Sequence, residues 1–162
     1  MTIGLLKEIY KDRPRDMRLM GMDIGKKTIG IALSDPLHGL ATPRQTIKRT
    51  KFTKDIHVLA EIICDYEVGG FVLGLPLNID GSEGPRCQAV RDFAAEMVNH
   101  PAIFGGDPWI ALHDERFSTV SADNLVDGAV SKRKAKEKGI TDMLAAQVIL
   151  QDALETINKA EA

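Results

Sequence analysis

Four acidic residues have neighbours that would suit a cation-binding site. Asp23 ends one short apolar segment, Asp114 and Glu115 end another, and Asp142 precedes a long amphipathic segment. Carboxylates are hard oxygen ligands that suit Mg²⁺ or Mn²⁺, and a cluster of them can hold one or two such ions. Two ions in one site support hydrolysis of a phosphodiester bond. We therefore take Asp23, Asp114, Glu115 and Asp142 as candidate metal ligands.

Each acid also has an ordinary structural explanation. Asp23 could simply form a turn with the glycine that follows it closely. Asp114 and Glu115 could cap a loop or pair with the arginine beside them, and Asp142 could favour a helix dipole. Neighbouring residues of a strand point to opposite faces, so we expect only one of Asp114 and Glu115 to face a site.

The stretch after the first apolar segment resembles a phosphate-binding loop but does not fit one. Only three residues separate Gly21 from Gly25, and Lys27 stands between Lys26 and Thr28. The nucleotide-binding pattern needs four residues at that spacing and a hydroxyl residue directly after its lysine. We interpret Gly25 as part of a hairpin turn, with Lys26 and Lys27 as phosphate contacts at the mouth of the site.

Two basic stretches are candidates for contact with a polyanion. Residues 48–54 (KRTKFTK) carry four cations and no acid, and residues 132–138 (KRKAKEK) carry five cations and one acid. Both could equally be solvated surface loops, and the net charge of -2 argues against a general polyanion binder. The segment that ends at Asn78 could place donors beside a substrate. The candidate substrate-binding residues are Lys26, Lys27, Asn78, Arg116, Lys132, Arg133 and Lys134.

Composition limits the other function classes. A chain of 162 residues suits one domain, and neither cysteine nor histidine spacing predicts a disulfide framework or a zinc site. No apolar run approaches the roughly 20 residues that span a bilayer. We expect a reduced, cytoplasmic protein with no membrane partner.

The apolar pattern predicts a mixed α/β domain. We expect strands at 18–23, 28–34, within 39–50, at 71–75 and at 109–112. Helices are expected from residue 53 or 54, from 85, from 118 or 119 through 126, and from 141, with Thr141 as the last N-cap. The first three strands should be antiparallel, and strands joined through helices should be parallel. Sites in such sheets form beyond the carboxyl ends of parallel strands, where Asp23 and Glu115 would lie.

Four sequence blocks in this order resemble the YqgF family of ribonuclease H-like proteins. They are DIGKKTIGIALSDP at 23–36, VLGLPLNIDGSEGPR at 72–86, DERFST at 114–119 and TDMLAAQVILQ at 141–151. The resemblance covers residues 18–154, and Thr28 departs from it by standing where many members carry Arg. We expect a lead-in at 1–17 with a short helix over 3–10, a nuclease domain at 18–158 and a tail at 159–162.

The resemblance implies a ribonuclease H-like five-stranded sheet in the order 3-2-1-4-5, with strand 2 antiparallel and helices on both faces. It also implies a bacterial, cytoplasmic nuclease that matures the 5′ end of precursor 16S ribosomal RNA with Mg²⁺ or Mn²⁺. Asp23, Glu115 and Asp142 would be catalytic, with Asp114 beside them. The partner would be precursor ribosomal RNA or a pre-ribosomal particle, and the protein a monomer or weak homodimer.

Three alternatives are left open by the residues. The same chemistry would serve a Holliday junction resolvase, which normally needs a dimer to cut two strands. The domain could also bind nucleic acid without cleaving it. A nucleotide phosphotransferase with an Asp-x-Gly hairpin would need two such domains, and this chain has room for one.

Overall fold

The protein forms one mixed sheet of six strands with helices packed against it. A computed structural model describes residues 2–115 and 134–162, without the side chains of residues 2 and 134–139. The elements in chain order are β1 (Thr2–Leu5), α1 (Leu6–Ile9), the short 3-10 helix η1 (Tyr10–Asp12), β2 (Arg18–Ile24), β3 (Thr28–Ser34), β4 (Ala41–Lys48), α2 (Phe52–Tyr66), β5 (Val68–Leu75), α3 (Pro85–Val98), α4 (Pro101–Phe104), β6 (Trp109–Asp114) and α6 (Lys134–Glu161).

The strand order is β1-β6-β5-β2-β3-β4. The five strands from β6 to β4 reproduce the predicted 3-2-1-4-5 order, and β3 is antiparallel to β2 as expected. The predicted strand count was wrong by one, because residues 2–5 form an edge strand parallel to β6. We had expected only a helix in this lead-in, and the observed helix α1 is confined to Leu6–Ile9. The strand buries one edge of β6 that the five-stranded sheet would have left open.

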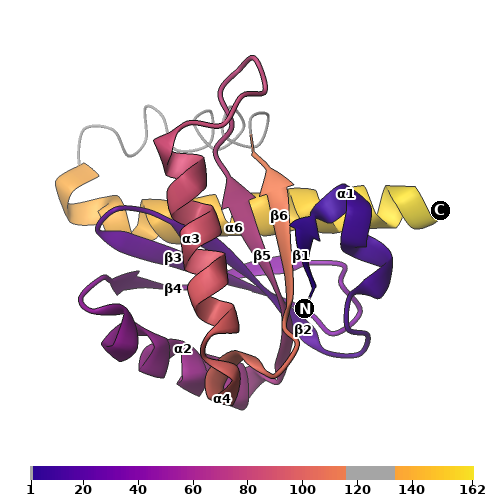
Figure 1. The fold of residues 1–162 in the computed structure, drawn as a ribbon, viewed down its shortest axis with the longest axis horizontal. Helices are drawn as coiled ribbons and strands as arrows, with labels where there is room; N and C mark the ends of the chain where they lie inside the picture. Colours follow the sequence, from indigo (N-terminus) through magenta and orange to yellow (C-terminus); the bar gives the residue numbers. More distant parts are fainter. Residues whose placement is uncertain (1, 116–133) are drawn as a thin grey trace.

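Alternation along the strands divides the core into two layers. Met20, Met22 and Ile24 of β2 pack under α2, α3 and α4. Leu19, from the opposite face of β2, packs instead with apolar residues of α6. Figure 1 shows this arrangement, with α3 in front of the sheet and α6 crossing behind it. The predicted placement of helices on both faces is confirmed.

Glycines on the α6 face bring the helix unusually close to the sheet. A Cβ atom at Gly21 would lie 2.6 Å from the Cβ of Leu150, and one at Gly30 would overlap the backbone carbonyl of Asp142. Real Cβ atoms do not approach other atoms so closely, so neither position tolerates a side chain without movement of α6. The glycines therefore set the distance between Asp142 and the sheet.

The last helix begins earlier than predicted. We expected Thr141 to cap it, but α6 begins at Lys134 and runs for 28 residues. Asp142 consequently lies within the helix rather than at its start, so a helix-dipole explanation of this acid is wrong. The predicted start was too late because Thr141 is a favourable N-cap residue in sequence but is not used as a cap here. The helix expected from residue 118 or 119 through 126 lies outside the described residues.

The far end of α6 is tied to the N-terminal segment. Arg13 donates to both carboxylate oxygens of Glu161, at 2.9 and 2.8 Å, and its Nε donates to His38 Nδ1 at 3.0 Å. These bonds from Arg13 hold the pKa of Glu161 at about 2. Despite its length, α6 is not apolar enough to cross a membrane, and the same holds for the other helices within 2–115 and 134–162.

The close contact at Gly21 leads to a stability prediction. Replacing Gly21 with Ala should lower the free energy of unfolding by about 1–3 kcal/mol, because α6 must shift outward to admit the methyl group. Gly106→Ala is the matched control: nothing lies within 4 Å of a Cβ there. That control should be neutral or slightly stabilising. Denaturant unfolding measures both; equal effects at the two glycines would contradict the close-packing argument.

Candidate active site at the carboxyl edge of the sheet

Asp23 lies near the end of the central strand β2, on the face covered by α6. Its neighbours Met22 and Ile24 point into the opposite core layer, so alternation places Asp23 under α6. The Asp23 side chain is only half-buried. It is thus held by a buried strand and still open to solvent at the sheet edge.

Glu115 reaches the same place from β6. Its backbone N–H donates to the carbonyl of Leu75 at 3.3 Å, which ties it to the end of β5. A Cβ atom at Gly74 would lie 2.5 Å from Glu115 Oε2, so the carboxylate occupies the space left by the missing side chain. Because Met22 pairs with Leu73, Gly74 follows directly beside Asp23. Gly74 therefore lets the Glu115 carboxylate fold back toward Asp23.

Asp114 points away from this group. It pairs with Leu75, whose side chain belongs to the core layer under α3, and paired residues of parallel strands face the same side. We expected only one of Asp114 and Glu115 to face the site, and in the structure that residue is Glu115.

Asp142 joins the group from α6, which packs on this face of the sheet. Its Oδ2 accepts a hydrogen bond of 2.6 Å from the Thr28 hydroxyl on β3. Its backbone carbonyl lies directly over Gly30, the neighbour of Asp23 across the β2–β3 pair. One turn of helix and two strands thus position the Asp142 carboxylate.

Repulsion between the carboxylates adds to burial in raising two of their pKa values. Burial and the negative charge of Asp142 raise the pKa of Asp23 to about 6, and the guanidinium of Arg86 opposes this shift only in part. Burial and the charges of Asp23 and Asp114 raise the pKa of Glu115 to about 7. Asp23 is the shared member of two interacting pairs, one with Asp142 and one with Glu115. A bound cation would relieve this repulsion.

The donor set fits a hard divalent ion in its chemistry. Within the described residues, no three His, Cys, Asp or Glu side chains are arranged to hold one ion together. Mg²⁺ nevertheless often binds through one or two carboxylates and completes its shell with water and substrate phosphate. The pairs around Asp23 supply that minimum, and every ligand is an oxygen, as Mg²⁺ and Mn²⁺ prefer.

Known proteins with similar sequences decide the family. Residues 17–156 match the RuvX family, which is described as Holliday junction resolvase. The chain belongs to the RuvX family. The predicted YqgF-type resemblance is thereby confirmed.

Two curated relatives and one solved structure extend this result. A Rhodospirillum centenum protein is 45% identical over all of this chain and 86% of its own length. A Paramagnetospirillum magneticum protein is 46% identical over 96% of each chain, and both carry the name "Putative pre-16S rRNA nuclease". The fold resembles Thermus thermophilus RuvC, solved with a Holliday junction substrate, with a TM-score of 0.53 at 12% identity over 90% of this chain and 97% of that one. The RuvC likeness supports the ribonuclease H-like fold alone.

The other predicted site residues of this RuvX-family chain are scattered. Lys26 and Lys27 are exposed on the β2–β3 turn, next to Asp23. Asn78 is exposed, but its amide donates to Ser82 Oγ at 3.0 Å and braces its own loop. Arg116, Lys132 and Arg133 lie outside the described residues, and Lys134 is described only as the first residue of α6.

Three residues at the site were not among the predicted ones. Arg86 donates to the carbonyl of Ile24 at 2.8 Å and lowers the pKa of Asp23. Thr28 holds Asp142, and Arg49 donates to the carbonyl of Gly25 at 2.7 Å. Arg86 ends the block at 72–86 and could have been noted from it. The partners of Thr28 and Arg49 are far away in the chain or across a turn, so only the fold reveals them.

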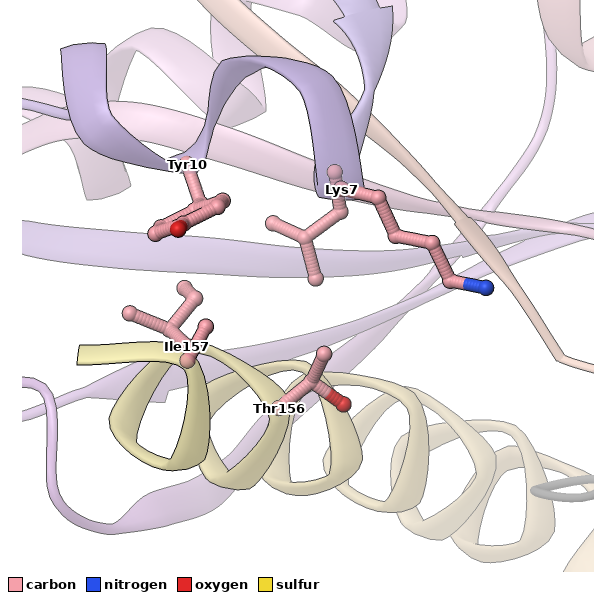
Figure 2. A pocket seen from close by; sticks show the side chains of 6 residues that line it. Lys7, Tyr10, Thr156 and Ile157 are labelled. Carbon is pink, nitrogen blue, oxygen red and sulfur yellow. The ribbon is translucent and has the colours of Figure 1, made fainter. Parts of the chain in front are cut away.

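A separate pocket lies at the opposite end of α6. It measures about 200 Å³ and is lined by side chains of α1 and of the last turns of α6. Figure 2 shows Tyr10 and Lys7 facing Thr156 and Ile157 across it. This pocket contains none of the candidate carboxylates, so it is not part of the site.

The raised pKa of Asp23 predicts how stability depends on pH. Between about pH 4 and pH 6 the folded, metal-free chain retains a proton on Asp23 that the unfolded chain releases, so rising pH destabilises the fold there. Asp23→Asn removes this loss. Its free energy of unfolding relative to wild type should therefore increase by roughly 2–3 kcal/mol from pH 4 to pH 8.

Denaturant unfolding in EDTA across this range would measure the difference. The control is Asp65→Asn, the same substitution at an exposed acid on α2. If the difference in unfolding free energy between Asp23→Asn and wild type did not change with pH, burial and the charge of Asp142 would not raise the pKa of Asp23.

Proposed function

We propose that this chain is a metal-dependent nuclease that hydrolyses RNA phosphodiester bonds and processes the 5′ end of precursor 16S ribosomal RNA in the cytoplasm. The observation that carries the proposal is the meeting of Asp23, Glu115 and Asp142 at the carboxyl edge of the sheet. Membership of a resolvase family and the names of two close relatives support a nuclease. Ribosomal RNA as the substrate rests on those names.

In this proposal the metal would be held by the carboxylate pairs around Asp23, with Asp142 on one side and Glu115 on the other, and Asp114 would not take part. Bound Mg²⁺ or Mn²⁺, as one or two ions, would supply the charge that activates water and stabilises the leaving oxygen. Thr28 fixes the orientation of Asp142 through its hydroxyl. Arg86 brings a positive charge close to Asp23 and favours its ionised form. A carboxylate must be ionised to bind a metal, so Arg86 assists loading at neutral pH.

Lys26 and Lys27 would bind substrate phosphates beside the carboxylates. Both are exposed on a turn that directly follows β2. Arg116, Lys132, Arg133 and Lys134 are further candidates for phosphate contacts, and Asn78 would act by shaping the loop at 76–84. A monomer or weak homodimer suffices for cutting a single RNA strand, alone or on a pre-ribosomal particle.

A second candidate is cleavage of four-way DNA junctions. The description of the family as Holliday junction resolvase favours it. It uses the same carboxylates and differs in the substrate and in the need for two sites per assembly.

Cleavage assays with matched substrates test these proposals. Wild type should cut precursor 16S ribosomal RNA with Mg²⁺ or Mn²⁺ and lose this activity in EDTA. Asp23→Asn should lower the rate by more than about 100-fold, since even outer-shell partners of a metal are worth 10- to 100-fold. Circular dichroism should show an intact fold.

The same enzymes should be offered a four-way DNA junction and ATP. Preferred cleavage of the junction by a dimer would replace the RNA proposal with the resolvase. Turnover of ATP alone would revive a phosphotransferase, and binding of RNA without any cleavage would leave a binding module. Full activity of Asp23→Asn would remove Asp23 from the site.

A further inference from the structure

We infer that five exposed lysines form a basic rim that binds the sugar–phosphate backbone of a nucleic-acid strand beyond the scissile phosphate. The rim consists of Lys26 and Lys27 on the β2–β3 turn, Lys48 at the end of β4, and Lys51 and Lys54 around the start of α2. This inference rests on the proposed function, because it places the strand relative to the carboxylates. It adds Lys48, Lys51 and Lys54 to the binding surface.

Arg49 joins the two segments of the rim. Its backbone N–H donates to the carbonyl of Lys27 at 2.8 Å, and its Nη1 donates to the carbonyl of Gly25 at 2.7 Å. The guanidinium also lies over the ring of Phe93, with its carbon 5.6 Å from the ring centre. The turn that carries two lysines and the segment that carries the other three are therefore fixed against each other.

The rim begins on the same face as the carboxylates. Thr28 pairs with Lys48 across β3 and β4, and its hydroxyl donates to Asp142. Side chains directly opposite each other in an antiparallel pair lie on one face, with Cβ atoms about 5 Å apart. Lys48 therefore leaves the edge strand on the Asp142 side of the sheet. Lys51 and Lys54 follow in the chain at the start of α2, which packs on the opposite face of the sheet.

The positive charge of the rim is unopposed. Among the residues that the structure describes, none of the five lysines forms an ion pair. The acid nearest in sequence, Asp55, is buried, and its carboxylate accepts bonds from the Thr50 N–H and hydroxyl at 2.7–3.1 Å. Asp55 thus closes the loop from inside while the lysines face solvent.

The shape of the rim favours a long polyanion over a small anion. The lysines follow one another over a turn, a strand end and a helix start, whereas a small anion needs donors that converge on one point. A row of cations along an open edge suits successive phosphates, which provide most of the affinity of nucleic-acid binders. The carboxylates at one end of the row select a nucleic acid over other polyanionic surfaces.

The test compares a rim variant with a charge-matched control. Lys48→Gln, Lys51→Gln and Lys54→Gln are combined in one chain, and Lys7→Gln, Lys11→Gln and Lys159→Gln in another. The control lysines are also exposed. They belong to the end of the molecule with α1 and the C-terminus, whereas β3, β4 and α2 lie at the other end (Figure 1).

Binding of a fluorescein-labelled 20-nucleotide single-stranded RNA is measured by anisotropy in EDTA, where no cleavage can occur. The rim variant should bind at least tenfold more weakly than wild type at 100 mM salt. The slope of log affinity against log salt concentration should fall by about 2, because about three phosphate contacts are lost. The control should change affinity less than twofold.

One further variant makes the result specific. Replacing the same three lysines with Arg keeps the charge and should restore binding, and thermal unfolding should be unchanged in every variant. The inference is overturned if the rim variant binds RNA like the control variant. It is also overturned if the rim variant loses binding only to vesicles rich in anionic lipid and not to RNA.

The outcome is separable from that of the proposed function. Binding is measured without metal, so it does not depend on cleavage. A rim variant with weak binding and a wild type that cuts no RNA would support the rim and refute the nuclease. A wild type that cuts RNA and a rim variant that binds normally would support the nuclease and refute the rim.

Discussion

The close approach of α6 to the sheet is the constraint on which the rest of the site depends. Asp142 belongs to a helix, whereas Asp23 and Glu115 belong to strands, and nothing in the chain connects them locally. They meet because β2, β3 and β5 each present a glycine to α6, at Gly21, Gly30 and Gly74. A side chain at any of these positions would lift the helix or displace a carboxylate. The glycines bury less apolar area between helix and sheet than larger residues would. Their missing side chains leave the space in which the carboxylates come together.

That proximity opposes folding at neutral pH. The pKa of Asp23 is raised to about 6 and that of Glu115 to about 7. The metal-free fold therefore carries unfavourable charge when both carboxylates are ionised. Two buried core layers offset this unfavourable charge. Arg86, which donates a hydrogen bond to the end of β2, also helps to offset it. Carboxylates whose pKa values are raised by burial and by like charges are typical of functional sites. Thr28 adds to this by holding Asp142 when no ion does so.

The sequence predicted most of the sheet and the acids that meet at its edge, because both depend on local patterns. Apolar strands followed by Asp23 and by Asp114-Glu115 are visible in the chain, and the rule of carboxyl ends brings them together. The start of α6 was missed because Thr141 offers a good cap, whereas the helix begins seven residues earlier, at Lys134. The strand at residues 2–5 was missed because its partner β6 is more than 100 residues away. Arg49 and Arg86 act through backbone carbonyls, which leave no trace in a residue pattern.

The fold places the acidic and basic side chains of this nearly neutral chain in two separate groups, the carboxylates of the site and the lysines of the rim. A net charge of -2 would repel a nucleic acid if it were evenly spread. Instead, Asp23, Glu115 and Asp142 are gathered where a cation can neutralise them, and Asp55 is turned into the core of its loop. The lysines of the turn and of the β4–α2 segment are left outside, with Arg49 holding the two segments together. The surface that a phosphate backbone meets is therefore positive even though the protein is not. The acids would attract that backbone only with a cation between them and the phosphate, so in the proposed function the cation would link cleavage to binding.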